Sequence, residues 1–417
     1  MLEYVYIFII MLVFIPILYV RIRYPFWSTQ PVFHTYDYLR YLTRTPFQIH
    51  TQLYSKSYKN DANVKTIKFL DMDDKDVDKI VNLLQSHYVE SDQILSFINK
   101  QTLTDTFSGQ FYPSYISFYN KDKLNVVYDE TGAVTIQNTP NIVGCMTGRS
   151  IHMFILDKSD IIHEKPGYYW DYICVHRDYT HENLGRKMIQ SHDMHQRSNT
   201  KDIGMSLFKK EINLCEGVVP LVKYQVLTFA LSKIHRPPIP APYNVYRVYN
   251  DKVDTFYDLL YKMSHQGNNL KQQFVAFPDI SVLDTLIQTS SLLVYALKYG
   301  YELQCIYLFK NPLLCYDGIE GGHILECTST IFNTHVQEDI PNALLFTGFL
   351  HALHHIQKSF VSKYKVITFH NLGHNHNIIE RWRWKYNPLS INDAAYYLYN
   401  GVIAGMPVDQ TKCTIVV

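Results

Sequence analysis

The chain has 417 residues, of which 39 are basic and 38 acidic, so its formal net charge is +1 with histidine neutral. Proteins that bind nucleic acid usually carry a basic excess or stripe, and this balance argues against that class. Hydrophobic residues make up 47% of the chain, enough for a sizeable core in two ordinary domains or one large two-lobed one. The seven cysteines are scattered and form no Cys-x-x-Cys pair, which argues against a disulfide scaffold or zinc knuckle and favours reduced thiols in the cytosol.

An uncharged apolar run covers residues 4–20, with Glu3 before it and Arg21 and Arg23 after it. As a helix its 17 residues would span about 25 Å. A membrane core needs ~20 helical residues, so the run is short but within range. The run lacks the basic start and the cleavage site of a signal peptide. The positive-inside rule therefore predicts a single-pass membrane anchor over residues 1–23, with the folded part facing the cytosol. A buried N-terminal helix is the alternative.

Proline marks the best domain boundary. Four prolines fall within residues 237–242, and such a stretch ends any helix and favours an extended polyproline conformation. We therefore expect an N-terminal half at residues 24–236 and a C-terminal half at residues 237–417.

Both halves show mixed periodicity. Residues 74–84 place apolar side chains at helical spacing after an acidic start, which predicts a helix. The other expected helices are at about 183 onward, 253–263 and 343–359, and the expected strands are at 115–119, 141–145, 151–155, 172–175, 292–297 and 303–309. Trp382 and Trp384 alternate with two arginines, as in a strand with one buried face. Strands and helices in two similar halves predict an α/β or α+β fold.

Four sequence blocks occur in order along the chain. They are Phe-Trp-Ser-Thr-Gln-Pro-Val at 26–32, His-Tyr-Val-Glu-Ser-Asp at 87–92, Asp-Tyr-Ile-Cys-Val-His at 171–176 and Tyr-Tyr-Leu-Tyr-Asn at 396–400. Seventeen residues follow the last block and end in an apolar Ile-Val-Val tail, which we expect to be led into the protein rather than frayed. From about residue 25 to its end, the chain resembles the glycylpeptide N-tetradecanoyltransferases (N-myristoyltransferases) of the GNAT acyltransferase superfamily.

This resemblance implies two GNAT-like halves that share a saddle-shaped mixed sheet, the first binding acyl-CoA and the second much of a peptide. Enzymes of the family move a fatty acyl group, myristoyl, from myristoyl-CoA to the amine of an N-terminal glycine. The resemblance therefore implies a monomeric N-acyltransferase with acyl-CoA and N-terminal glycine peptides as partners. It implies no metal site and no permanently bound cofactor.

The strand, turn and helix start at residues 172–189 resemble the superfamily's phosphate-binding motif, in which backbone amides and a helix N-terminus face the pyrophosphate of coenzyme A. The resemblance places the oxyanion hole at the amides of Tyr172 and Ile173. It assigns the base that deprotonates the glycine ammonium to the terminal carboxylate of Val417, a group that is ionised near neutrality. The residues that it implies for cosubstrate binding are Pro25, Phe26, Trp27, Cys174, Val175, His181, Glu182, Asn183, Leu184, Gly185 and Arg186.

The phosphate turn departs from the family. Where the family has Arg-Ser-Lys-Arg-Leu-Ala-Pro, residues 180–186 are Thr-His-Glu-Asn-Leu-Gly-Arg. Three basic residues are lost, and Glu182 adds a negative charge where phosphates would bind. A catalytically inactive protein of the same fold, which binds acyl-CoA or lipopeptides or serves as a structural membrane protein, is therefore the alternative.

Histidines are frequent, and three of them (His351, His354 and His355) have helical i, i+3, i+4 spacing. Such a group could hold zinc. Because the 19 histidines are scattered along the chain, we interpret these three as ordinary surface or core residues.

Overall fold

The computed structural model describes residues 2–37, 47–53, 63–89, 94–128, 134–157, 159–249, 252–265, 272–333, 341–360 and 363–417. The elements up to the middle of the chain are α1 (Leu2–Arg23), η1 (Trp27–Thr29), β1 (Phe47–Gln48), β2 (Val64–Lys68), η3 (Phe69–Asp71), α3 (Asp74–His87), β3 (Ile94–Ser96), α4 (Lys100–Phe107), β4 (Tyr115–Tyr128), β5 (Val134–Leu156), β6 (Ile162–Val175), η4 (Arg177–Glu182), α5 (Leu184–Asn199) and β7 (Ser206–Glu211).

The remaining elements are β8 (Val222–Ala230), β9 (Tyr243–Arg247), α6 (Val253–His265), β10 (Phe274–Phe277), α7 (Ile280–Gln288), β11 (Leu292–Tyr299), β12 (Glu302–Lys310), β13 (Leu314–Tyr316), β14 (Gly322–Phe332), α8 (Asn342–Ser359), β15 (Tyr364–His370), α9 (Asn375–Arg383), β16 (Ser390–Tyr399), β17 (Gly401–Val402), η6 (Gln410–Lys412) and β18 (Cys413–Ile415). The predicted helices and strands up to residue 359 are present, except that the runs at 141–145 and 151–155 belong to the single long strand β5.

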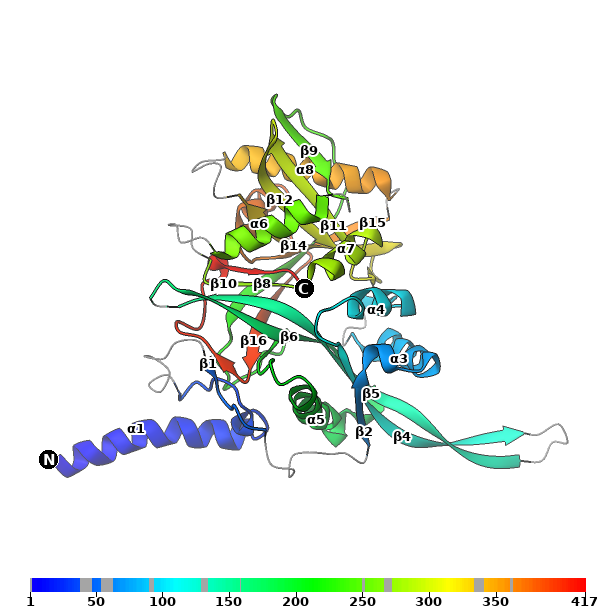
Figure 1. The fold of residues 1–417 in the computed structure, drawn as a ribbon, viewed down its shortest axis with the longest axis vertical. Helices are drawn as coiled ribbons and strands as arrows, with labels where there is room; N and C mark the ends of the chain where they lie inside the picture. Colours follow the sequence, from blue (N-terminus) through cyan, green and yellow to red (C-terminus); the bar gives the residue numbers. More distant parts are fainter. Residues whose placement is uncertain are drawn as a thin grey trace.

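A large mixed sheet contains most of these strands, in the order β18-β10-β5-β6-β7-β16-β8-β15-β14-β12-β11-β9, with β2, β3, β4 and β13 attached beside this path, and β1 pairs separately with β17. Helices lie on both sides of it, with α3 and α4 across the sheet from α5 (Figure 1). This arrangement confirms the prediction of a mixed α/β fold.

Two parallel strand pairs organise the sheet. The helix α5 joins β6 to its parallel neighbour β7, and α8 joins β14 to its parallel neighbour β15. The strand that follows each unit then crosses over: β8 pairs with β15, and β16 pairs with both β7 and β8. Each part of the sequence thus completes the sheet of the other, and the division at residues 236 and 237 stays a prediction.

The helix α3 forms for reasons that the sequence shows. Asp73 caps it by accepting a hydrogen bond from the amide of Lys75, and two aspartates in the first turn favour the positive end of the helix dipole. Its buried side chains, Val77, Ile80, Leu83 and Leu84, recur at helical spacing and face the sheet.

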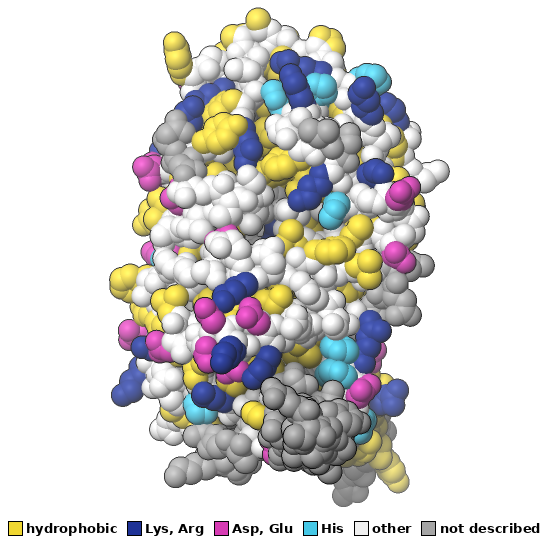
Figure 2. All heavy atoms as spheres, turned by 90° about the vertical axis from the view of Figure 1, so that its right-hand side faces the viewer, with side chains coloured by type: hydrophobic (Ala, Val, Ile, Leu, Met, Phe, Trp, Pro, Cys, Tyr) yellow, Lys and Arg dark blue, Asp and Glu magenta, His cyan; other side chains and the backbone are white. Residues whose placement is uncertain are grey.

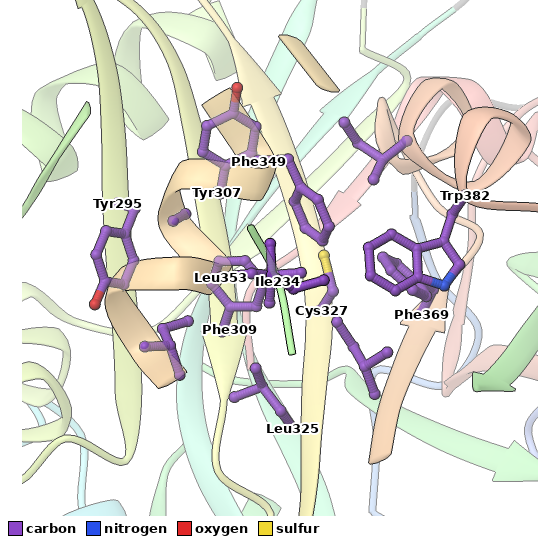
Figure 3. Packing of buried hydrophobic residues seen from close by; sticks show 14 of the residues in the cluster. Ile234, Tyr295, Tyr307, Phe309, Leu325, Cys327, Phe349, Leu353, Phe369 and Trp382 are labelled. Carbon is purple, nitrogen blue, oxygen red and sulfur yellow. The ribbon is translucent and has the colours of Figure 1, made fainter. Parts of the chain in front are cut away.

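The core of the C-terminal part lies between the strands β11, β12, β14 and β15 and the helices α8 and α9. Figure 3 shows Phe309 and Phe369 from the strands and Phe349 and Trp382 from the helices pointing toward one another. The ring of Trp382 lies 5.5 Å from that of Phe369 and 5.9 Å from that of Phe349. Because burial of such a side chain contributes about 1.5–3 kcal/mol, this contact fixes α9 against the sheet.

The strand expected around Trp382 is wrong, because residues 375–383 form the helix α9. Trp382 is fully buried and Trp384 is 81% exposed. Side chains two residues apart on a helix point about 200° apart, so one buried and one exposed tryptophan fit a helix end as well as a strand.

The predicted membrane anchor is also wrong. In the part of the chain that the structure describes, no helix has the length and apolar character needed to cross a membrane. Residues 2–23 do form a helix, but it contains Pro16, and Val20, at the end of the apolar run, is buried against the folded body. There Gly217 approaches Val20 and Tyr24 so closely that a Cβ atom at residue 217 would lie 2.9 Å from Val20.

Two of the helically spaced histidines hold α8 against the start of the proline stretch and the residues just before it. The Nε2 atom of His351 lies 2.6 Å from the carbonyl oxygen of Pro237, and Nδ1 of His354 lies 3.0 Å from that of Ile234. Each ring nitrogen donates its proton to a carbonyl, so these histidines have a structural role.

Candidate functional site

The strand β6 contains a bulge at Tyr172 and Ile173. On its neighbour β5, Thr147 pairs with Asp171 and Cys145 pairs with Cys174, so two residues of β6 face one residue of β5. Tyr172 has a φ of 47°, a conformation that costs a non-glycine residue about 1–3 kcal/mol and often occurs at functional sites. A bulge takes its amides out of the ladder, and the amide of Tyr172 donates to Oδ1 of Asp171 at 2.9 Å.

The strands β6 and β7 separate next to this bulge. They pair in parallel from Tyr168 and Ser206 as far as Trp170 and Phe208. Beyond that point β6 continues to Val175 along β5, whereas β7 continues to Glu211 along β16. The bulge therefore lies at the edge of an opening in the sheet.

The predicted phosphate turn follows β6. It consists of η4, of Asn183 in the left-handed conformation with a φ of 57°, and of the start of α5. Leu184 is completely buried and anchors this helix start. Gly185 faces the end of β6, where a Cβ atom would lie 3.9 Å from Val175. His181 and Arg186 are exposed.

Lys121 of β4 neutralises the acidic residue in this turn. Its ammonium lies 2.6 Å from Oε1 of Glu182 and 4.2 Å from the ring centre of Tyr179. The hydrogen bond from Lys121 lowers the pKa of Glu182. The turn thus has a basic partner that comes from another strand and is absent from the motif.

The block at residues 26–32 lies beside the turn and beside β7. The guanidinium of Arg186 lies 5.5 Å from the ring centre of Phe26, and Trp27 stacks on Phe208 at 5.7 Å. The block also meets the one at 396–400, because Tyr399 donates to Oε1 of Gln30 at 2.8 Å. Pro25 is exposed, and its carbonyl accepts a hydrogen bond from Ser28 at 3.0 Å.

The apolar tail is led into the protein, as expected. The strand β18 pairs in parallel with β10, and the amide of Val416 donates to Ala276 at 2.8 Å. Ile415 and Val416 are buried, Val417 is half-buried, and Figure 1 shows the chain end in the middle of the molecule. The ammonium of Lys310, at the end of β12, donates to the main-chain oxygen of Val417 at 3.1 Å.

Lys310 belongs to a set of charged groups that we call the central charged cluster. Its members are Arg149, Asp171, Lys209, Glu211, Lys310 and Glu326. Nζ of Lys209 lies 2.6 Å from Oε1 of Glu211. Lys310 is the partner of Glu326 in the ladder between β12 and β14. Lys310 also interacts electrostatically with Asp171, next to the bulge. All members except the buried Arg149 are half-buried, so they retain access to solvent or to a ligand.

Burial disfavours the charged forms of two groups in this cluster. It lowers the pKa of Lys310 and raises the pKa of Glu326. The adjoining His370 is buried, and burial, together with nearby Lys209, lowers its pKa to about 3. Among the described residues, Nε2 of His370 has no hydrogen-bond partner. A neutral imidazole beside the cluster can therefore accept from or donate to a polar ligand.

The structure brings some predicted site residues together. Phe26 contacts Arg186, and Tyr172 and Ile173 form the bulge. Cys174 is buried, with its thiol 3.8 Å from the carbonyl of Leu83. Sequence reasoning missed Lys121 and Lys310, and the only signal for Lys310 is a charge directly after the apolar run at 305–309.

The surface over α3 and α4 carries side chains of both charges. Figure 2 shows basic and acidic side chains interspersed there. Lys100 of α4 and Asp74 of α3 form an ion pair, with 2.8 Å between Nζ and Oδ1. A depression of about 610 Å³ lies between η3 and the residues after α5, and none of the predicted site residues lines it.

The sequence matches no protein-family model and no curated protein. The structure is similar to that of Saccharomyces cerevisiae N-myristoyltransferase with bound myristoyl-CoA, with a TM-score of 0.65 and 12% identity over 94% of this chain and 99% of that chain. A further structure of that enzyme with myristoyl-CoA and inhibitors has a TM-score of 0.65 and 13% identity over 91% of this chain and 90% of that chain.

A tandem GNAT protein from the clavulanic acid biosynthesis pathway is similar with a TM-score of 0.50 and 10% identity, over 81% of this chain and 99% of that chain. At these identities the similarity shows the fold. The predicted GNAT-like fold is confirmed to that extent.

Proposed function

We propose that this chain is an N-acyltransferase of the N-myristoyltransferase type, which moves a fatty acyl group from acyl-CoA to the amine of an N-terminal glycine. The observation that carries the proposal is the bulge at Tyr172 and Ile173, which lies where β6 and β7 separate. Lys310 and Asp171 connect this bulge to the chain end at Val417. The similarity in fold to a protein with bound myristoyl-CoA supports the choice of cosubstrate.

In the proposed reaction the glycine amine attacks the thioester carbon. The carbon–sulfur bond then breaks, and coenzyme A leaves as the thiol, with the second proton that the attacking nitrogen loses as the amide forms. Negative charge develops on the thioester oxygen, and the amides of Tyr172 and Ile173 stabilise it. To do so, the oxygen replaces Asp171 as the acceptor of the Tyr172 amide.

The terminal carboxylate of Val417 receives the proton that the glycine ammonium must lose before it attacks. With the proposed carboxylate of Val417 added to the central charged cluster, three groups are cationic and four are anionic, so the set carries one net negative charge when all are ionised. This negative excess favours binding of a cationic acyl-acceptor substrate, such as a peptide with an N-terminal glycine ammonium.

The proposed cosubstrate site combines the turn with the N-terminal block. The turn residues His181, Glu182, Asn183, Leu184, Gly185 and Arg186 surround the phosphates, and Pro25, Phe26 and Trp27 line the adjoining surface. Cys174 and Val175 belong to the strand that leads to the turn. The ion pair of Lys121 and Glu182 leaves Arg186 and Lys187 as the basic groups for phosphate.

Acyl-CoA binding by the full chain is the first test, by calorimetry with myristoyl-CoA and with free CoA. Micromolar binding that needs the acyl chain would support the site, and no binding of either ligand would refute the proposal. Transfer to a glycine-initiated peptide is the second test, with a variant that carries extra residues after Val417. We expect that variant to bind acyl-CoA but to transfer nothing. Binding without transfer in the unmodified chain would favour an inactive acyl-CoA-binding protein.

A further inference from the structure

We propose that Lys310 is a positioning residue, whose ammonium holds the terminal carboxylate of Val417 in a fixed orientation and in its ionised form. This inference rests on the proposed role of Val417 as the base. It names the residue that keeps this base in a usable state.

The tail does not need Lys310 to reach the interior. The pairing of β18 with β10 and the hydrogen bond from the amide of Val416 to the carbonyl of Ala276 already set its depth. Lys310 adds a hydrogen bond of 3.1 Å to the oxygen of the last residue, from a half-buried position on a different strand. Such a charge-assisted bond fixes the direction in which the carboxylate points.

The charged groups around Lys310 explain why the positive charge of its ammonium matters. Asp171 on β6 and Glu326 on β14 are the anionic side chains that act on it, and Arg149 on β5 and Lys209 on β7 are the cationic ones. Because Lys209 already pairs with Glu211, removal of Lys310 leaves three carboxylates, including that of Val417, with Arg149 as their main cation. Neighbouring carboxylates without a cation bind protons more readily.

The loss of the Lys310 charge should therefore raise the pKa of the Val417 carboxylate. A carboxylate that loses an opposite charge at hydrogen-bond distance shifts upward by about one to three pH units. A purely structural lysine would change stability and leave this pKa where it is.

The experiment measures that pKa directly, in full-length protein made with ¹³C-carbonyl-labelled valine. The terminal carboxylate is the valine carbon that titrates in the NMR spectrum. We expect its midpoint to rise by about one pH unit or more in Lys310→Met and in Lys310→Gln, and to stay near that of the unmodified protein in Lys310→Arg. Lys298→Met, at the opposite end of the ladder between β11 and β12, is the matched control and should not shift it.

Equal midpoints in the unmodified protein and in whichever of the two neutral variants folds would overturn the proposal. The acid side of the pH profile for peptide acylation, measured in parallel, should shift in the same direction as the midpoint. If the unmodified protein transfers no acyl group, the proposed function fails, and the titration still decides the role of Lys310.

Discussion

Asn400 is a buried polar residue in the left-handed conformation, with a φ of 58°. Its side chain accepts from the amide of His50 at 2.8 Å and donates to the carbonyl of Gly204 at 2.7 Å. Its own amide donates to the carbonyl of Pro31 at 2.6 Å. The asparagine that ends the block at 396–400 thus joins three distant segments, and its role is structural.

We expect Asn400→Ala to lower the free energy of unfolding by about 2–4 kcal/mol, because several buried polar groups lose their partners at once. Urea unfolding monitored by circular dichroism measures this change. Asn213→Ala, at an exposed position, is the control and should stay within about 0.5 kcal/mol of the unmodified protein. Equal losses in the two variants would contradict the structural role.

The pair of Lys121 and Glu182 makes a prediction about the phosphate turn. Lys121→Ala leaves Glu182 unneutralised, so free CoA should bind about two- to fivefold more weakly, the range expected for an exposed ion pair. The double variant with Glu182→Gln should restore the affinity, because it removes the exposed charge. Calorimetric titration with CoA at low salt measures both, and a double variant as weak as the single one would exclude this explanation.

At the scale of elements, α1 meets the folded body at its last turn. Gly217 has a φ of 79°, and a Cβ atom there would lie 2.9 Å from Val20 and 3.2 Å from Tyr24. The amide of Tyr24 donates to the carbonyl of Val20 at 2.9 Å and so reports whether this turn is formed. The position of the helix end therefore depends on a glycine almost two hundred residues away.

Gly217→Ala should loosen this contact and increase hydrogen exchange at residues 20–24. Gly300→Ala is the matched control, since Gly300 also has a positive φ, 58°, but open space around it. Both variants should lose about 1–2 kcal/mol through backbone strain, and only the first should change exchange in α1. Unchanged exchange at residues 20–24 in Gly217→Ala would show that the contact does not hold the helix.

At the scale of the whole molecule, buried titratable groups govern stability in acid. Burial lowers the pKa of His192 and of His370 to about 3 and that of His374 to about 4. These histidines stay neutral in the folded protein while the unfolded chain binds protons below pH ~6.5. Asp193 acts in the opposite direction, because burial raises its pKa to about 6.

The balance predicts that stability falls as the pH drops below about 6. These three histidines favour the unfolded state and Asp193 favours the folded one, so these four groups together make the unfolded chain take up about two more protons. The free energy of unfolding should fall by about 2–3 kcal/mol per pH unit between pH ~6 and ~4.5. Urea midpoints measured across that range give the slope.

The ring of His374 stacks on that of Phe332, with 4.1 Å between the ring centres. His374→Phe keeps an aromatic ring at this position and removes one titrating group. Its slope should be smaller by about 1.4 kcal/mol per pH unit. His235→Phe, at an exposed position, should leave the slope unchanged. The same slope in all three proteins would mean that these buried histidines do not control the acid transition.

Several features of this protein could be predicted from local sequence. The helical spacing at 74–84 specifies which face of that helix is buried, and the apolar runs at 292–297 and 303–309 belong to strands that are buried on both faces. The apolar tail was expected to enter the protein, and it does. The alternation of arginine and tryptophan at residues 381–384 led to a wrong prediction, because a strand and a helix end can both show it. At Trp382, packing against Phe349 and Phe369 selects the helix.

The charges at the candidate site were decided by the tertiary structure. Lys121 reaches Glu182 because β4 runs beside the turn, and Lys310 reaches Val417 although 107 residues separate them in sequence. Periodicity encodes which residues of one element face the core, but it carries no information on which element lies opposite. Strand order supplies that information. The sequence by itself therefore determined the elements and the block that forms the bulge. The fold decided which cations lie beside the carboxylates of the candidate site.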